Sequence, residues 1–253
     1  MGSSESVTRS GRVLPAFGII GWRWISRNPA SAIVPVMLPF LFLYFLRIIS
    51  PPEYFPLAVA GAMLYTTQNI GSWCLTDAAV NRIELRLQEI FVASPLGKIR
   101  YLIGVAVSNF IAAAPALVVQ GVLLALVWPV PLWAWGVLAG CIFVIWILFS
   151  AIGIAISTRI KSQREIWPIG NLIFSVLGIV SPIYYPLSIL PPAWQTVARF
   201  LPSTYAAELV HGSLGLPQVP ASAETLALDA VLLVVSALIG IAIALVVYRW
   251  RER

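Results

Sequence analysis

Residues 101–158 read YLIGVAVSNFIAAAPALVVQGVLLALVWPVPLWAWGVLAGCIFVIWILFSAIGIAIST, and no Asp, Glu, Lys or Arg interrupts them. A membrane-spanning helix needs about 20 apolar residues, so this stretch is too long for a single crossing. It contains WPVPLW at 128–133, where proline ends helices and tryptophan favours the membrane interface. The stretch therefore predicts two membrane-spanning helices, over residues 101–128 and 132–158.

Charge-free runs on either side of this stretch predict further spans. The chain is 60% hydrophobic and 10% charged, whereas a soluble domain carries about 25% charged residues. The runs are continuous and about twice as long as the alternating strands of a membrane β-barrel. We therefore expect an all-α integral membrane protein, with one transmembrane domain over residues 1–253. We expect six spans in all, and the four that lie outside residues 101–158 are expected over residues 29–49, 54–76, 166–190 and 228–248.

The basic residues gather on one side of these spans. Fourteen of the sixteen Lys and Arg residues precede the first span, follow the sixth, or lie between the second and third or the fourth and fifth. Only Arg47 and Arg199 fall on the opposite side. Because basic residues near span ends stay in the cytoplasm, both termini are expected there. Topology and anionic membrane lipid account for the net charge of +6, and no nucleic-acid partner is expected.

Residues 12–28 predict a helix that lies on the membrane surface. When successive residues are placed 100° apart around a helix axis, the apolar side chains occupy one broad arc. Arg12, Arg23 and Arg27 lie opposite that arc. This pattern is typical of an interfacial helix. Asn28–Pro29 would then turn the chain into the first span. The alternative is a plain extension of that span.

The segment 81–95, NRIELRLQEIFVASP, predicts an amphipathic cytoplasmic helix. Its apolar residues recur at helical spacing, and charges of both signs lie between them. Ser94–Pro95 ends the helix. Such a helix between two spans suits docking into a groove on a soluble partner. A surface helix lying on the bilayer is the alternative.

The main external segment, residues 191–212, predicts two short amphipathic helices separated at Pro202. A pair of this kind can dip into the outer leaflet as a re-entrant element, provided that its backbone packs against protein. His211, the one histidine of the chain, lies here and is expected to be an interface or loop residue.

The sequence offers no catalytic arrangement. We find no nucleophile–base pair and no metal-ligand spacing, and Cys74 and Cys141 are expected to be packing residues within spans. Gly97–Lys98 is the only Gly-Lys pair, and it lacks both the upstream glycine and the following Ser or Thr of a phosphate-binding loop. If ATP drives this protein, another polypeptide holds the nucleotide.

Polar side chains inside two spans mark candidate functional positions. Polar groups in a membrane tend to face the interior of the bundle, either as contacts between helices or as the lining of a pathway. No charge lies deep in any span, which argues against an ion-driven carrier. The candidate pathway residues share a face of the second span (Tyr65, Gln68, Asn69 and Ser72) or of the fifth (Asn171 and Ser175).

The chain resembles the permease subunit of ABC exporters of the type-2 class. An interfacial helix precedes six expected spans, and Glu84 to Pro95 resembles the family's E-x-x-x-x-E stretch that leads to Ser-Pro. The segments SPIYYPL at 181–187 and LPSTYAAE at 201–208 resemble the family's sequence around the fifth span. One departure is that Arg86 and Leu87 stand where the family often has Gly-Thr.

The resemblance implies a working unit of two permease chains, with a homodimer as the expected arrangement, and two ABC ATPase subunits that hold ATP and Mg. Residues 81–95 would be the coupling helix, and the pathway would run between the permeases along their second and fifth spans. It also implies the plasma membrane of a prokaryote. The expected ATPase contacts are Arg82, Glu84, Arg86, Leu87, Glu89, Ile90, Arg159, Lys161 and Arg164; the expected external gate is Tyr184, Tyr185, Trp194 and Phe200.

Two other functions stay open on the sequence alone. One is a secondary transporter or channel that is driven by an ion gradient and works without an ATPase. The other is a membrane scaffold that transports nothing.

Overall fold

A computed structural model describes residues 13–27, 29–85, 98–217, 219 and 221–248. Within these ranges the secondary structure is helical, with no strand, which confirms the all-α fold class. The helices are α2 (Val13–Arg27), α3 (Pro29–Ile49), η1 (Pro52–Tyr54), α4 (Phe55–Ile83), α6 (Lys98–Val127), α7 (Leu132–Ser157), α8 (Gln163–Val180), η2 (Leu187–Ile189), α9 (Pro192–Ala198), α10 (Pro202–Ser213) and α11 (Ala223–Val247).

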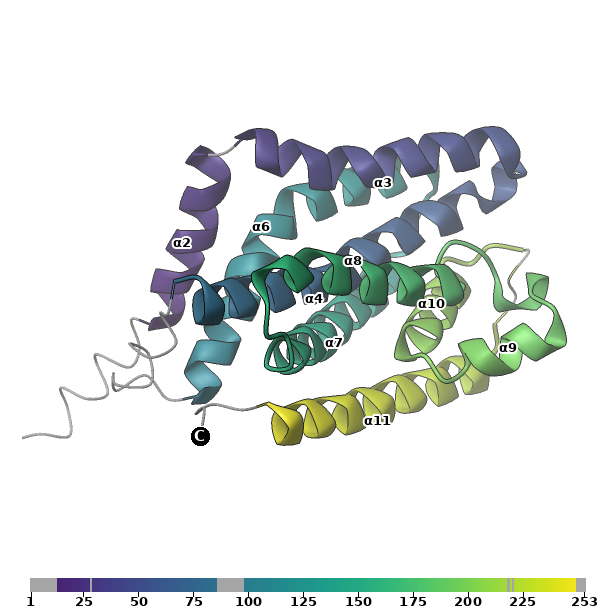
Figure 1. The fold of residues 1–253 in the computed structure, drawn as a ribbon. Coiled ribbons are helices and arrows are strands. Elements are labelled where there is room, and N and C mark those ends of the chain that lie inside the picture. The colour runs from purple at the N-terminus through teal and green to yellow at the C-terminus, as the bar shows by residue number, and fades with distance from the viewer. Residues whose placement is uncertain (1–12, 28, 86–97, 218, 220, 249–253) are drawn as a thin grey trace, which may run out of the picture.

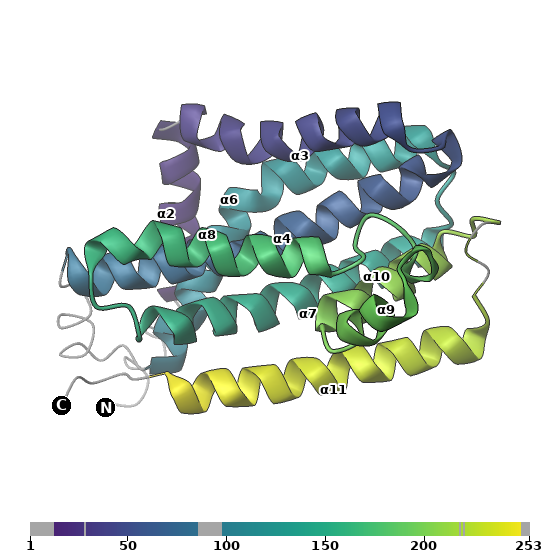
Figure 2. The ribbon, with the colours of Figure 1, turned by 45° about the vertical axis from the view of Figure 1, so that its right-hand side comes forward.

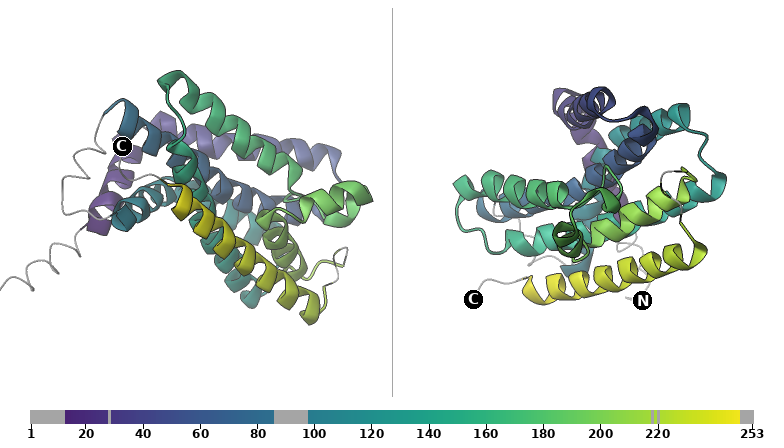
Figure 3. Two further views of the ribbon diagram at one scale, coloured as in Figure 1. Left: turned by 60° about the horizontal axis from the view of Figure 1, so that its bottom comes forward. Right: turned by 90° about the vertical axis from the view of Figure 1, so that its right-hand side faces the viewer.

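Six long helices, α3, α4, α6, α7, α8 and α11, run between two ends of a bundle (Figures 1 and 2). Helix α2 crosses one end, which we call the α2 end, and α9 and α10 lie at the other, the α10 end. The last turn of α4 and the turn between α7 and α8 lie at the α2 end. Helices α3 and α11 form opposite outer sides (Figure 3).

In the part of the chain that the structure describes, three helical stretches are long and apolar enough to cross a membrane by length and composition: Ile99–Val127, Leu132–Ser157 and Ala223–Val247. A shorter apolar stretch covers Pro39–Ile49 of α3. Helix α4 carries its polar cluster at the centre, and it packs against α3, α6, α7, α8 and α10. A helix that is surrounded by protein needs no continuous apolar surface, because its polar groups face other helices rather than lipid.

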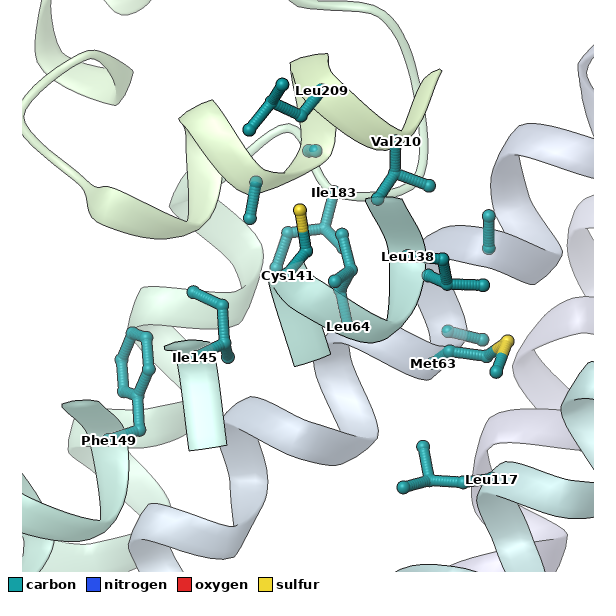
Figure 4. Close-up of a cluster of buried hydrophobic side chains, with 14 of the residues drawn as sticks. Met63, Leu64, Leu117, Leu138, Cys141, Ile145, Phe149, Ile183, Leu209 and Val210 are labelled. Carbon is teal, nitrogen blue, oxygen red and sulfur yellow. The ribbon is translucent and has the colours of Figure 1, made fainter. Parts of the chain in front are cut away.

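The core lies where α4 meets α7 and α10. Met63 and Leu64 of α4 approach Leu138 and Cys141 of α7, and Val210 of α10 covers them (Figure 4). Cys74 is also buried, and neither cysteine forms a disulfide, so both serve as packing residues. Burial of such side chains between helices gives the bundle its tight interior.

The helix boundaries differ most from the expected spans in α4 and α8. Helix α4 continues to Ile83, so residues 81–83 belong to it rather than to a separate coupling helix. Helix α8 begins at Gln163 and ends at Val180, whereas the fifth span was expected over 166–190. Pro182 and Pro186 follow α8 and cannot continue a helix.

The non-helical chain after α8 is buried rather than exposed. Ser181 and Ile183 have relative exposures of 1% and 0%. A Cβ added to Gly61 of α4 would overlap the carbonyl oxygen of Ile183, so glycine is what allows this close approach. Irregular backbone at membrane depth is tolerated when it packs against protein in this way.

Helix α2 packs on α6 through part of its apolar arc. The Phe17 ring lies over Gly104, and Gly21 lies against the backbone of Ser108. Ile20 and Trp22 remain more than half exposed. An apolar surface that stays uncovered on a helix crossing the bundle end suits contact with lipid headgroups and upper acyl chains.

Candidate functional site

The polar face of α4 meets α8. The Tyr65 ring lies against Gly178, where an added Cβ would overlap ring carbons, and the Tyr65 hydroxyl is hydrogen-bonded to Ser175. Further along the contact, Ser72 Oγ lies 3.1 Å from the position that a Cβ on Gly170 would take. Glycines of α8 therefore let the polar side chains of α4 lie close to its backbone.

The other predicted pathway residues differ in their surroundings. Gln68 is 1% exposed, and neither its amide nitrogen nor its amide oxygen has a hydrogen-bond partner among the described residues. Asn69 is half-buried on α4, and Asn171 is exposed on α8. A buried amide without a hydrogen-bond partner is costly, so Gln68 is the least satisfied of the predicted pathway residues.

A groove of about 870 Å³ lies beside this contact, between α3, α4 and the chain that follows α8. No charged side chain lines it among the described residues. Its lining is mostly aromatic and aliphatic, with tyrosine hydroxyls as polar groups, a composition typical of pockets that bind small organic molecules. The lining residues are Pro39, Leu41, Phe42, Tyr44, Phe45, Ile48, Tyr65, Gly178, Ser181, Tyr184 and Tyr185.

Aromatic contacts join the walls of the groove. The Phe42 ring of α3 stands edge-on to Tyr184 with a centroid separation of 4.7 Å. The Tyr184 ring is in turn 6.0 Å from that of Tyr65. Such pairs stabilise the arrangement beyond the area that they bury.

Two of the four predicted gate residues line this groove, and two do not. Tyr184 and Tyr185 are half-buried in its wall. Trp194 is 56% exposed on α9 and Phe200, just after it, is 83% exposed, and neither side chain lines the groove. These two side chains face outward, as expected for residues near a membrane surface.

Helix α3 supplies over half of the lining residues, a contribution that the sequence analysis missed. A signal exists in the sequence: Leu41, Tyr44, Phe45 and Ile48 recur at helical spacing, and all four are exposed along one side of α3. A helix whose one charged residue, Arg47, lies in its last turn offers little polarity contrast from which this face could be chosen.

The predicted ATPase contacts fall into three groups. Arg159, Lys161 and Arg164 are exposed at the turn between α7 and α8, and Glu84 is exposed just after α4. Arg82 is half-buried and directed into the bundle end, where its guanidinium donates to Ser157 O at 2.7 Å and to Ile160 O. Four further predicted contacts lie outside the described residues, namely Arg86, Leu87, Glu89 and Ile90.

His211 is a buried residue of α10, contrary to the expectation of an interface or loop position. It is 1% exposed, and its Nε2 lies 3.1 Å from Ile183 O. Burial lowers the pKa of the His211 imidazole to about 4. The ring therefore holds α10 to the irregular chain after α8 as a neutral group at physiological pH.

Two further hydrogen bonds join elements at the α10 end. Thr204 Oγ1 donates to Ala198 O at 2.6 Å, which fixes the short link between α9 and α10. Trp128 Nε1 donates to Leu214 O at 2.8 Å and ties the end of α6 to the end of α10.

Among the described residues, no group of three His, Cys, Asp or Glu side chains could hold a metal ion.

A family model for ABC-2 type transporters matches residues 22–214, from α2 to the end of α10. The chain belongs to the ABC-2 type transporter family. The match includes the groove, the α4–α8 contact and the turn between α7 and α8. This permease is thus a membrane-embedded transport subunit and not itself a catalytic chain. A comparison with curated proteins found no significant match.

Proposed function

We propose that the permease forms the substrate pathway of an ATP-driven exporter as a dimer, coupled to separate ATPase subunits. The family match over 22–214 carries this proposal, because transporters of this family generally work with ABC ATPase partners and as dimers. In this arrangement both termini are cytoplasmic, α3, α4, α6, α7, α8 and α11 cross the plasma membrane of a prokaryote, and α9–α10 form the external re-entrant element.

The groove between α3, α4 and α8 is the proposed half of the pathway in each copy. Its open side would face the second permease, so two grooves would enclose one cavity. The charge-free lining suits a neutral or amphipathic substrate, because an ion would lose its hydration there without gaining a partner. Tyr184 and Tyr185 stand at its outer part as the proposed gate.

The ATPase subunits are proposed to bind the α2 end. Exposed cations at the α7–α8 turn and the exposed Glu84 lie there, and the described start of the segment 81–95 is the last turn of α4 at the same end. ATP and Mg would be held by those subunits, since the chain has no phosphate-binding loop. Closure of the ATPases on nucleotide would then move α4 and change the arrangement of the groove.

Association of purified permease with the ATPase encoded beside it tests this proposal. We expect Glu89→Arg and Leu87→Asp each to weaken the complex by about tenfold or more, because a reversed or buried charge opposes docking in a groove. Glu224→Arg and Leu132→Asp make the same changes on exposed residues at the opposite end and serve as matched controls.

Unchanged association in both docking variants would refute the assigned role of residues 81–95. Failure of the wild-type chain to bind any ATPase, together with ion-driven flux in ATP-free liposomes, would favour a secondary transporter instead.

A further inference from the structure

The guanidinium of Arg82 joins two segments that are distant in sequence. Arg82 lies in the last turn of α4, and it donates to Ser157 O, at the end of α7, over 2.7 Å. It also donates to Ile160 O, in the turn that leads to α8. One side chain thus links the end of α4 to the end of α7 and to the turn that follows it.

The chemistry of this contact suits a firm link. The last carbonyl groups of a helix have no partner within the helix, and a cation near them interacts favourably with the helix dipole. A guanidinium holds its N–H donors in a rigid planar fork, whereas the three donors of an ammonium group rotate at the end of a flexible side chain. Arg82 therefore binds two carbonyl groups, of which that of Ser157 also accepts from Ile160 N at 3.2 Å, and fixes their positions relative to α4.

The start of the α7–α8 turn is also bonded to the last turn of α7. Ser157 Oγ donates to Ile154 O at 2.6 Å, and Thr158 Oγ1 donates to Ala155 O at 2.7 Å. Ile160 is only 2% exposed, so the turn is anchored in the bundle. These bonds keep the turn rigid, so a displacement of the Arg82 guanidinium is transmitted to the turn as a whole.

The turn passes directly into α8. Ser162 caps this helix, and its Oγ accepts from Arg164 N at 3.4 Å. Helix α8 carries Gly170 and Gly178, which pack on the polar face of α4. Arg82 thus connects the two helices whose contact borders the groove, at the end where they are expected to receive force.

We propose that Arg82 is a positioning residue for coupling: it binds the α7–α8 turn to α4, so that a displacement of the segment after α4 moves α8 as well. This rests on the proposed function, because the displacement comes from the ATPase. In this role Arg82 acts inside the permease rather than by touching the ATPase.

Hydrogen–deuterium exchange on the permease–ATPase complex tests the proposal without a transported substrate. The complex is compared in its nucleotide-free form and after trapping with Mg-ATP and orthovanadate. In the wild type, trapping is expected to change exchange in the segment after α4 and in residues 163–180. In Arg82→Ala we expect the affinity for the ATPase to stay within about twofold of wild type. Trapping should still change hydrogen–deuterium exchange in the segment after α4, but it should no longer change exchange in residues 163–180.

Two further variants keep the test decisive. Arg82→Lys retains a cation with N–H donors, but on a shorter side chain without the planar fork, and is expected to restore part of the α8 response, which a folding defect would not produce. Arg100→Ala removes an exposed cation in the first turn of α6, at the same end, and is expected to behave as wild type. Loss of association in Arg82→Ala would show that Arg82 contacts the ATPase.

A full α8 response in Arg82→Ala would overturn the coupling role. Absence of ATPase binding or of any trapped-state change in the wild type would instead overturn the proposed function on which it rests.

Discussion

Gly153 of α7 lies directly against Gly71 of α4, so that a Cβ added to Gly153 would overlap the carbonyl oxygen of Gly71. The reciprocal position is also closed, because a Cβ on Gly71 would lie 2.6 Å from Phe149 O of α7 and 2.3 Å from a ring carbon of Phe174. Small residues at a helix crossing allow the backbones to approach, which is how helices in a membrane gain packing contacts. This crossing fixes α7 against the central helix α4.

The crossing predicts a specific loss of stability. Gly153→Ala is expected to lower the free energy of unfolding by about 1–3 kcal/mol, since the helices must move apart to admit a methyl group. Gly140→Ala is the control on the same helix, because Gly140 has no atom within 4 Å of an added Cβ. That variant should be neutral or stabilising by up to about 1 kcal/mol. Thermal unfolding in detergent measures both, and equal effects would contradict the close crossing.

A buried hydrogen bond predicts a coupled pair of substitutions. Gln120 Nε2 donates to Thr66 Oγ1 at 3.0 Å, and both residues are buried between α4 and α6. Thr66→Val should cost about 1–3 kcal/mol, because it leaves the Gln120 amide without that partner. Adding Gln120→Leu should recover much of this loss, since no polar group is then left unpaired. Additive effects in the double-mutant cycle would argue against the bond.

His211 predicts a pH-dependent stability. Its folded pKa of about 4 lies below the ordinary value of 6.5, so between these values the unfolded chain binds a proton that the folded chain does not. The contribution of the buried, neutral imidazole to the free energy of unfolding is complete above pH 6.5 and is lost as the pH falls toward 4. Thermal unfolding across this window should decline more steeply in the wild type than in His211→Gln, which cannot titrate. Parallel profiles would show that the imidazole is not buried as described.

The groove predicts a difference in access to water. Leu41 on α3 and Leu238 on α11 are 67% and 61% exposed, but only Leu41 lines the groove. In the assembled transporter, Leu41→Cys should react with a membrane-impermeant maleimide about tenfold faster than Leu238→Cys, because thiolates form in water and not in lipid. The unsubstituted chain, whose two cysteines are buried, gives the background rate. Equal rates would show that lipid fills the groove.

Parts of the fold could be predicted because they depend on the order of residues along the chain. The 58 charge-free residues at 101–158 indicated two helices broken at the prolines, and α6 and α7 end and begin there. Periodicity placed Tyr65 and Ser72 on one side of the second span, and in the structure both side chains lie against glycines of α8. Both inferences follow from periodicity and from the cost of charge in lipid.

Other features depend on neighbours that are far apart in sequence. The irregular chain at 181–186 is stable because Gly61 and His211 cover Ile183, a fit that no local pattern reveals. The sequence places Arg82 among the exposed cytoplasmic cations, because the carbonyl groups that it binds lie about 75 residues away, in the turn at 157–160.

The sequence by itself determined the helical class, the polar faces and the segregation of basic residues, because apolar length and charge act residue by residue in a membrane. Tertiary structure alone decided that α3 supplies most of the groove, that α4 is enclosed by five other helices, and that Arg82 turns inward. Those features arise from the fit of one surface to another, and complementary shape and distant hydrogen-bond partners exist only once the helices have packed.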